Sequence, residues 1–280
     1  MLILPRLRSL LEQGQAAVLV TVERVEGSAP REAGARMIVR TTGDFHGTIG
    51  GGTLEWEALH LARDLLAPGA RPVLRRDFAL GPELSQCCGG RVRIHFERFR
   101  PEDRDRVAAL AQAEIAASNA TSLGLFGAGH VGRALVLALA PLPFIVRWID
   151  ERADAFPAAV PANVTKLAPK EPLSELDALP EGAFVLVMTH SHPLDLAITA
   201  KALESDRFAY VGLIGSATKR ARFLHRMEEA GVSAQQRARL VCPIGLRGIE
   251  GKEPAIIAAS TAAALLIARE TQLKEVAHDN

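Results

Sequence analysis

The sequence predicts an α/β protein, in which a C-terminal Rossmann-like domain built on a doubly wound parallel sheet follows a smaller N-terminal α+β domain. Two observations lead to this fold class. After residue 121, short apolar runs alternate with segments of helical length, as in parallel sheets covered on both faces. A glycine-rich turn also follows the first of these runs directly. The expected boundaries are residues 1–99 for the first domain, 100–120 for a helical connector and 121–280 for the second domain.

Patterns in the first hundred residues define the N-terminal domain. Strands are expected over 17–25, Arg36–Arg40 and Arg91–Phe99, and the last of these alternates polar and apolar residues as a half-buried strand does. A helix is expected over 53–66, where apolar residues recur at helical spacing. A second helical pattern over 101–118 supplies the connector.

The C-terminal domain is defined by four buried strands. They are expected over 122–126, Phe144–Ile149, 184–188 and 210–214. Near the end of the chain, Pro254 suits the first position of a long apolar helix, which we expect to be buried or to form an interface.

Composition and charge limit the classes of function that are expected of this protein. The chain has 280 residues, 48% hydrophobic and 23% charged, which is ordinary for a globular protein. Its 33 Lys and Arg residues nearly balance 32 Asp and Glu residues, leaving a net charge of +1. A nucleic-acid-binding surface is therefore not expected.

Cysteine usage and hydropathy indicate a cytoplasmic protein. Cys87, Cys88 and Cys242 form no CxxC pair, which fits a reducing compartment. The N-terminus lacks the apolar core of a signal peptide. The longest predominantly apolar stretch, 256–268, has 13 residues, whereas a membrane-spanning helix needs about 20, so no membrane association is expected.

The glycine-rich turn predicts a phosphate-binding crevice. Its sequence is Gly127-Ala-Gly129-His130-Val-Gly132, and Asp150 ends the next strand 23 residues after Gly127, near the position of a ribose-binding acid. Gly127 permits the tight turn, Gly129 lets backbone approach a phosphate, and Gly132 lets helix and strand pack closely. The following helix adds unpaired N–H groups. These five residues are candidate cofactor ligands, but the fold does not by itself specify NAD.

Two further segments leave the carboxyl ends of strands in the same sheet. In MTHSHPLD, His190, His192 and Asp195 are either metal ligands or capping and hydrogen-bonding groups, and the two histidines are candidates to face a cofactor. In GLIGSATKR, Gly215 ends a strand, Ser216 can cap the next helix, and Lys219 and Arg220 lie in its first turn. Basic residues there oppose the helix dipole, so we expect them either to be solvated or, as we prefer, to contact an anion or a partner.

The N-terminal domain carries two glycine clusters. In GTIGGGTLE, Gly50, Gly51 and Gly52 precede a helix that Thr53 can cap. Three successive glycines cost folding entropy, so a close approach to a ligand or another backbone is favoured over a plain connector.

The second cluster is Gln86-Cys87-Cys88-Gly89-Gly90. A thiolate there could ligate a soft metal or carry sulfur; the alternative is a pair of inert buried thiols in a turn.

Together these motifs resemble the xanthine dehydrogenase accessory protein family of the XdhC/CoxI type. The resemblance is carried, in order, by GSAPREAGARMIV, GTIGGGTLE, CCGGRVRI, GAGHVGRAL with WID, MTHSHPLD, YVGLIGSATKRARF and CPIGLRGIEGKEPAIIAAS. The family pattern has one cysteine before the paired glycines, which matches Cys88, so Cys87 is an addition.

The resemblance implies a cytoplasmic chaperone of the molybdenum cofactor, without turnover of its own. It implies binding of a pterin dithiolene that carries molybdenum and a terminal phosphate, with Cys88 as the candidate metal ligand. The implied partners are a cysteine desulfurase and apo-xanthine dehydrogenase, and a homo-oligomer is expected. The alternative is an NAD(P)-dependent oxidoreductase, which leaves the second glycine loop and the Cys–Gly–Gly segment without a role.

Overall fold

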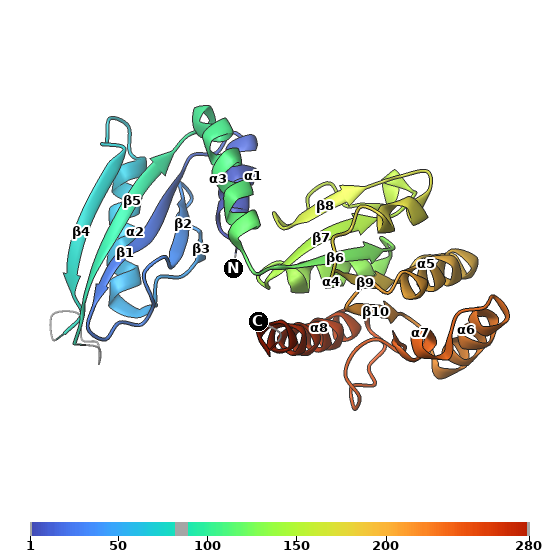
Figure 1. Cartoon of the computed structure of the whole chain (residues 1–280). Helices are drawn as coiled ribbons and strands as arrows, with labels where there is room; N and C mark the ends of the chain where they lie inside the picture. Colours follow the sequence, from blue (N-terminus) through green and yellow to red (C-terminus); the bar gives the residue numbers. More distant parts are fainter. Residues whose placement is uncertain (1, 82–88, 279–280) are drawn as a thin grey trace. The chain divides into compact units, whose positions relative to one another are not determined.

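The computed structural model describes residues 2–81 and 89–278 (Figure 1). The chain divides into two compact units, Met1–Ser118 and Asn119–Asn280. The first unit contains an antiparallel sheet and the second a parallel six-stranded sheet. The predicted fold class, a Rossmann-like domain after a smaller α+β domain, is confirmed.

The sheet of the first unit has the strand order β3-β2-β1-β5-β4. Its strands are β1 (Ala17–Glu26), β2 (Arg36–Arg40), β3 (Phe45–Gly47), β4 (Val73–Ala79) and β5 (Arg91–Phe99). The three strands expected from the sequence are present. β3 and β4 were not predicted, because β3 has only three residues and β4 is an edge strand in which Phe78 is buried and most of the other side chains are exposed.

Three helices cover this sheet. α2 (Gly52–Leu66) packs its buried face, which includes Leu54, Ala58 and Ala62, against apolar side chains of β1, β2 and β5. α1 (Leu4–Glu12) and α3 (Arg104–Ala117) form a second core together with Ile38 and Phe99. The stretch expected to connect the domains thus forms the short helix η2 (Pro101–Asp103) and α3, both inside the first unit.

The sheet of the second unit is parallel, with the strand order β11-β10-β9-β6-β7-β8. Its strands are β6 (Thr121–Phe126), β7 (Phe144–Ile149), β8 (Val164–Leu167), β9 (Phe184–Val187), β10 (Tyr210–Leu213) and β11 (Leu240–Val241). From β6 the chain runs outward to β8, then returns to β9 on the other side of β6. This reversal between β6 and β9 is the switch point at which open α/β sheets form their binding crevice.

Helices cover both faces of the parallel sheet. The helices are α4 (His130–Leu139), α5 (His192–Glu204), α6 (Ala217–Glu229), α7 (Ala234–Ala238) and α8 (Pro254–His278), with short η3 (Ala153–Ala155) and η4 (Pro172–Leu176). α4 and α8 contribute Leu135 and Leu265 to one core, and α5 and α6 contribute Ile198 and Phe223 to the other. Alternate residues of the central strands enter opposite cores, which explains the short uniformly apolar runs in the sequence.

The long helix α8 begins at Pro254, as predicted. Within it, Pro254–Glu275 is long and apolar enough to span a membrane by length and composition, with a mean hydropathy of 1.2 and a third of its most apolar window buried. The sequence prediction of no such span considered only the apolar stretch 256–268, whereas the helix continues beyond it to more polar residues. Ala258, Ala262 and Leu265 pack it into the second unit's core, and core helices of soluble proteins meet the same criterion.

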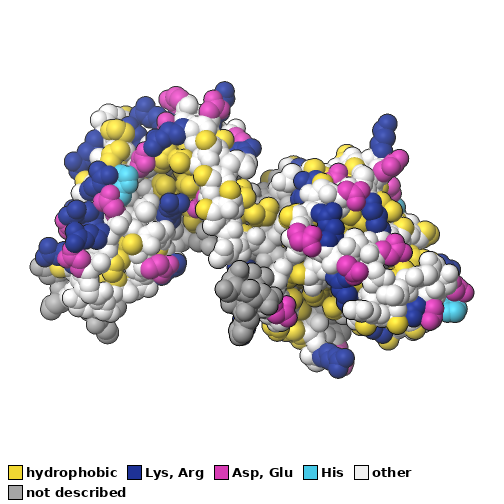
Figure 2. All heavy atoms as spheres, in the orientation of Figure 1, with side chains coloured by type: hydrophobic (Ala, Val, Ile, Leu, Met, Phe, Trp, Pro, Cys, Tyr) yellow, Lys and Arg dark blue, Asp and Glu magenta, His cyan; other side chains and the backbone are white. Residues whose placement is uncertain are grey.

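Charges of both signs are interspersed on the molecular surface. On the face drawn in Figure 2, Lys and Arg side chains alternate with Asp and Glu side chains over each unit. This mixture agrees with the near-zero net charge of the chain.

Candidate functional site

The glycine-rich turn lies at the switch point of the parallel sheet. Gly127 has φ 118°, and a side chain there would lie 2.2 Å from the carbonyl oxygen of Met188, at the end of β9. A side chain at Gly132 would lie 2.3 Å from the carbonyl oxygen of Gly127. The indole Nε1 of Trp148 donates to that same carbonyl at 2.9 Å. Gly127 and Gly132 are therefore required for packing of the turn itself.

Gly129 differs from its two neighbours. Its backbone has φ −73° and ψ −172°, which any residue adopts, and a Cβ there would meet no atom within 4 Å. It begins α4 as a cap without a side-chain hydrogen bond. The open space beside Gly129, at a helix N-terminus, is where backbone can approach a ligand. His130 follows it as the first residue of α4 and is exposed.

Asp150, the candidate ribose ligand, is buried within an internal hydrogen-bond network. Its Oδ2 accepts from the backbone N–H of Ala128 at 2.8 Å and from Nη2 of Arg152 at 2.9 Å. Its Oδ1 accepts from the backbone N–H and Nε of Arg152 at 3.0 and 2.9 Å. Burial opposes ionisation most strongly, but these hydrogen bonds outweigh it and hold the Asp150 pKa below its ordinary value. The Asp150 carboxylate thus ties the end of β7 to the glycine-rich turn.

The segments after β9 and β10 are joined by a buried ion pair. Lys219 Nζ donates to Asp195 Oδ2 at 2.7 Å and to the carbonyl of Ile214 at 2.9 Å. Asp195 Oδ1 accepts from the N–H and hydroxyl of Thr189 at 2.9 and 2.7 Å. A side chain at Gly215 would lie 2.6 Å from Lys219 Cδ, so the glycine lets the lysine fold back. Lys219, expected to face an anion, is instead directed inward to Asp195.

The two histidines of MTHSHPLD lie toward different partners. His190 Nε2 lies 3.6 Å from a Glu151 oxygen, and His192 Nδ1 lies 3.2 Å from Arg222 Nη2. Ser191 caps α5 by accepting from the Leu194 N–H at 3.4 Å. Within residues 2–81 and 89–278, no three His, Cys, Asp or Glu side chains come together as a metal site. The capping interpretation of this segment describes it better than the metal-ligand interpretation.

A pocket of about 630 Å³ opens where β11 ends. It is lined by residues 240–249 and by Arg220 from the first turn of α6. Arg220 and Arg247, both in this lining, form no side-chain hydrogen bond or ion pair with the residues that the structure describes. Ser216 caps α6 as predicted, accepting from the Lys219 N–H at 3.2 Å. The pocket therefore presents two uncompensated guanidinium groups at the ligand-binding edge of the sheet.

Cys242 lines the same pocket beside these arginines. Burial raises the pKa of its thiol, and the positive charges of Lys219 and Arg220 partly oppose that rise. The residue is 8% exposed, and its thiol stays protonated near neutral pH. Binding of a soft metal ion would favour the thiolate form of Cys242, whereas burial favours the thiol.

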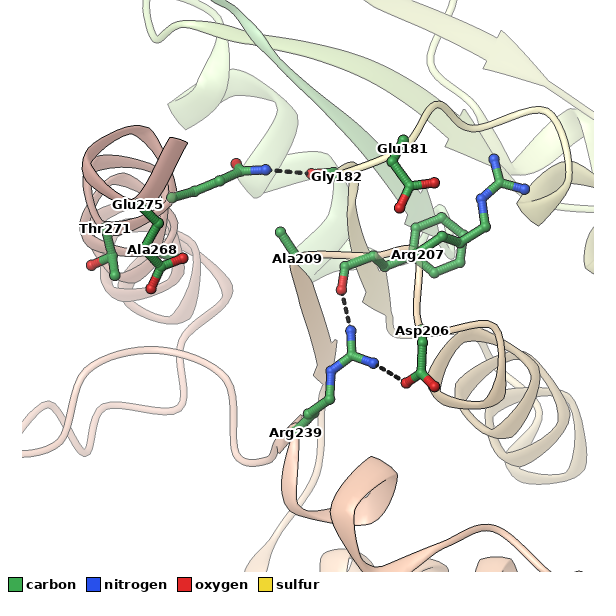
Figure 3. Close-up of a pocket in the computed structure, with 11 residues that line it drawn as sticks. Glu181, Gly182, Asp206, Arg207, Ala209, Arg239, Ala268, Thr271 and Glu275 are labelled. Carbon is green, nitrogen blue, oxygen red and sulfur yellow. Dashed lines mark hydrogen bonds and ion pairs between the residues drawn. The ribbon is translucent and has the colours of Figure 1, made fainter. Parts of the chain in front are cut away.

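A second pocket, of about 570 Å³, lies at the opposite, amino-terminal edge of the sheet (Figure 3). Arg239 donates to Asp206 and to the carbonyl of Phe208, and Gln272 of α8 donates to the Gly182 carbonyl at 2.9 Å. Arg239 is therefore neutralised by internal contacts. Because ligands of this fold bind at carboxyl ends of strands, we do not place the functional site here.

The glycine clusters of the first unit lie close to one another. A side chain at Gly50 would meet Pro30 Cγ at 2.6 Å, and one at Gly90 would meet the Ser28 carbonyl oxygen at 2.3 Å. Gly90 N–H donates to that carbonyl at 3.1 Å. GSAPREAG thus contacts residues of both glycine clusters, and the close approach predicted for Gly50 is to another segment of the chain. Cys87 and Cys88, which precede Gly89, lie outside the described residues.

Glu55 holds the loop before α2. Its Oε2 accepts from the Thr48 hydroxyl at 2.5 Å, from the Ile49 N–H at 3.0 Å and from the Gly51 N–H at 3.2 Å. The predicted cap by Thr53 is wrong: Gly51 is the N-cap residue, without a side-chain cap. The glycines at 50, 51 and 52 have φ of 129°, 76° and 64°, all in the region that favours glycine.

Sequence reasoning missed three side chains of the carboxyl edge. Arg152, Arg247 and Cys242 had no assigned role, although the last two fall inside a glycine-punctuated loop. That loop was the available signal for Arg247 and Cys242. Nothing in the sequence pattern distinguishes Arg152, since its importance depends on the rotamer that brings it onto Asp150.

Comparisons with known proteins match both units. Residues 123–265 match the XdhC Rossmann domain, and residues 10–77 match the XdhC and CoxI family. The chain is also similar over 96% of its length to a crystal structure of a xanthine dehydrogenase from Bacillus halodurans, with a TM-score of 0.62, 19% identity and 96% of that chain covered. This likeness establishes a shared fold.

Three relatives align with most of the chain. YqeB of Escherichia coli (strain K12), an uncharacterized protein, is 28% identical over 91% of this chain, which spans 44% of that relative's length. The molybdenum cofactor insertion chaperone PaoD of the same organism is 24% identical, covering 84% of this chain and 78% of its own. A probable xanthine dehydrogenase subunit of Bacillus subtilis (strain 168) is 26% identical, covering 94% of this chain and 96% of its own.

Proposed function

The chain belongs to the XdhC and CoxI family, and on that premise we propose that it is an accessory protein that binds the molybdenum cofactor. In this proposal the protein holds the cofactor during sulfuration and hands it to apo-xanthine dehydrogenase, without turnover of its own. The similarity to a relative named as a molybdenum cofactor insertion chaperone supports the cargo. The similarity to a probable xanthine dehydrogenase subunit supports the recipient.

The observation that carries the proposal is the pair of uncompensated arginines at the carboxyl edge. Arg220 and Arg247 line a pocket of about 630 Å³, large enough for a bound organic ligand. Guanidinium groups bind phosphate through paired N–H donors. A phosphorylated pterin is therefore matched in charge by this end of the sheet, and Cys242 offers a thiol beside it.

In this proposal the backbone at Gly129 is a second point of contact with the molybdenum cofactor. A Gly129→Val variant should fold normally, because the backbone conformation suits valine and the added atoms enter open space. It should lose most of the molybdenum that copurifies with the wild-type protein. Gly129→Ala should lose less, since it fills less of the approach. Full molybdenum content in folded Gly129→Val would place the cargo away from this turn.

The arginines are tested by single substitutions. Arg220→Ala and Arg247→Ala should each weaken cofactor retention about tenfold, the loss expected for one charge-assisted hydrogen bond. Arg226→Ala is the matched control, because this exposed arginine lies further along α6 and outside the pocket lining. Equal retention in all three variants would exclude the pocket.

The remaining parts of the proposal concern partners. A cysteine desulfurase would supply the sulfur, and Cys88 would ligate molybdenum, as the family resemblance implies. Exposed apolar side chains on α4 and α8, Leu137, Ile256 and Ile267, support self-association. Co-purification with the desulfurase and size-exclusion chromatography test these statements, and a monomer at all concentrations would contradict the last.

A further inference from the structure

The ribose subsite of the crevice is closed by the protein itself. In this fold the acid at the end of the second strand binds ribose hydroxyls, and Asp150 holds that position at the end of β7. A carboxylate has about four lone-pair sites. All four are used by the N–H groups of Ala128 and Arg152 described above, and the Asp150 side chain is only 2% exposed.

Arg152 is the closing residue. Its Nε and Nη2 form a two-pronged contact with the two carboxylate oxygens at 2.9 Å each, the geometry in which arginine and carboxylate pair most strongly. Its side chain is 41% exposed, so it lies between Asp150 and solvent. A ribose diol that approached Asp150 would have to displace this fork.

Charge around Arg152 also disfavours the phosphorylated dinucleotide. An arginine at this place accommodates the 2′-phosphate of NADP in related folds. Here Asp150, Asp154 and Glu151 all act electrostatically on Arg152, which leaves an excess of negative charge for a phosphate to meet. The subsite is therefore unsuited to both forms of the dinucleotide.

We infer that Arg152 is a specificity-determining residue that masks Asp150 and so excludes NAD(H) and NADP(H) from the crevice of this chain. The inference rests on side-chain contacts and not on the identity of the cargo. It explains how a chain with a glycine-rich turn of the dinucleotide-binding type can hold another ligand in its crevice.

The test is a titration of the full-length protein with NADH, in which the fluorescence of the nucleotide reports binding. Wild-type protein should show no saturation up to about 1 mM, and Arg152→Ala should bind NADH at least tenfold more tightly than that limit. The gain should disappear in Arg152→Ala/Asp150→Asn, since it requires the freed carboxylate. Arg133→Ala, which removes an exposed arginine of α4 that contacts the Ala155 carbonyl, should behave as wild type.

Two results would overturn the inference. One is saturable NADH binding by wild-type protein that Asp150→Asn removes. The other is a folded Arg152→Ala variant, as judged by circular dichroism and thermal melting, that gains no NADH binding. Arg152→Lys gives a second test if Arg152→Ala is unstable, because lysine keeps the charge but not the fork and should show a smaller gain. Molybdenum content plays no part in these readouts, so failure of the proposed cargo would leave them interpretable.

Discussion

At the scale of single residues, the second unit uses its buried carboxylates to hold its own loops together. Asp195 accepts from Thr189 and Lys219, and Asp150 accepts from Ala128 and Arg152. Each carboxylate connects a strand end to a neighbouring loop at the ligand-binding edge. Both were candidates for direct ligand contact in the sequence, where only their position after a strand is visible.

The Lys219–Asp195 pair should be important for stability. In Lys219→Met the Asp195 carboxylate, whose side chain is 1% exposed, loses the cation that pairs with it. The free energy of unfolding should fall by about 3 to 5 kcal/mol, as for other broken buried pairs. Arg220→Met, one residue further along, should change it by less than about 0.5 kcal/mol. Urea unfolding measures both, and equal stabilities would show that the pair contributes little.

The Asp150 network should make stability depend on acid pH. Because the folded-state pKa of Asp150 is lowered, its stabilising contribution is complete above the unfolded pKa of about 3.9 and is lost as pH falls through the folded value. The stability difference between wild type and Asp150→Asn should therefore be constant from neutral pH to about pH 5. It should shrink below about pH 4. Urea unfolding at a series of pH values measures it, and a difference that persists unchanged in acid would contradict the assignment.

At the scale of elements, the loop before α2 depends on one helical side chain. Glu55→Ala leaves the N–H groups of Ile49 and Gly51 without this acceptor, which should cost about 1 to 3 kcal/mol. Glu57→Ala, two residues further along the same helix and without a side-chain hydrogen bond to the described residues, is the control. Hydrogen exchange of residues 48–52 should accelerate only in Glu55→Ala, and protection in both variants would refute the role.

Sequence patterns predicted elements well where one feature dominates. β5 and β7 have the predicted bounds, because alternation in the first and continuous apolar burial in the second are unambiguous. β8 and β11 were missed because the first is a four-residue edge strand with two exposed residues and the second has only two residues. Short strands at sheet edges depend on the neighbour that pairs with them, which no local pattern records.

The sequence predicts at which edge of the sheet the candidate site lies, but not how the side chains of the site are arranged. Strand order places the glycine-rich turn beside MTHSHPLD, and Gly127 meets Met188 there. The direction of each polar side chain was not predictable, because it depends on contacts between residues distant in the sequence. Lys219 reaches Asp195 from 24 positions away, and the same basic residue in the first turn of α6 would otherwise face solvent.

At the scale of the whole molecule, the two buried carboxylates near the crevice are both paired with cations. Asp195 with Lys219 and Asp150 with Arg152 leave no described carboxylate there that is both buried and unpaired. A hydride-transfer enzyme needs a bound dinucleotide and a group that exchanges a proton with its substrate. The two buried carboxylates nearest the glycine-rich turn, Asp150 and Asp195, are both engaged in internal ion pairs.

The full-length protein should therefore show no hydride transfer at enzyme-like rates, which are above about 1 s⁻¹, with NADH or NADPH and small carbonyl compounds. Protein purified from molybdate-fed cells should instead contain close to one molybdenum atom per chain, with a pterin absorbance that denaturation releases. Metal analysis and nucleotide oxidation measured on the same preparation separate the two functions. Turnover that survives removal of molybdenum would identify an oxidoreductase, and it would require Arg152 to leave Asp150 during the reaction.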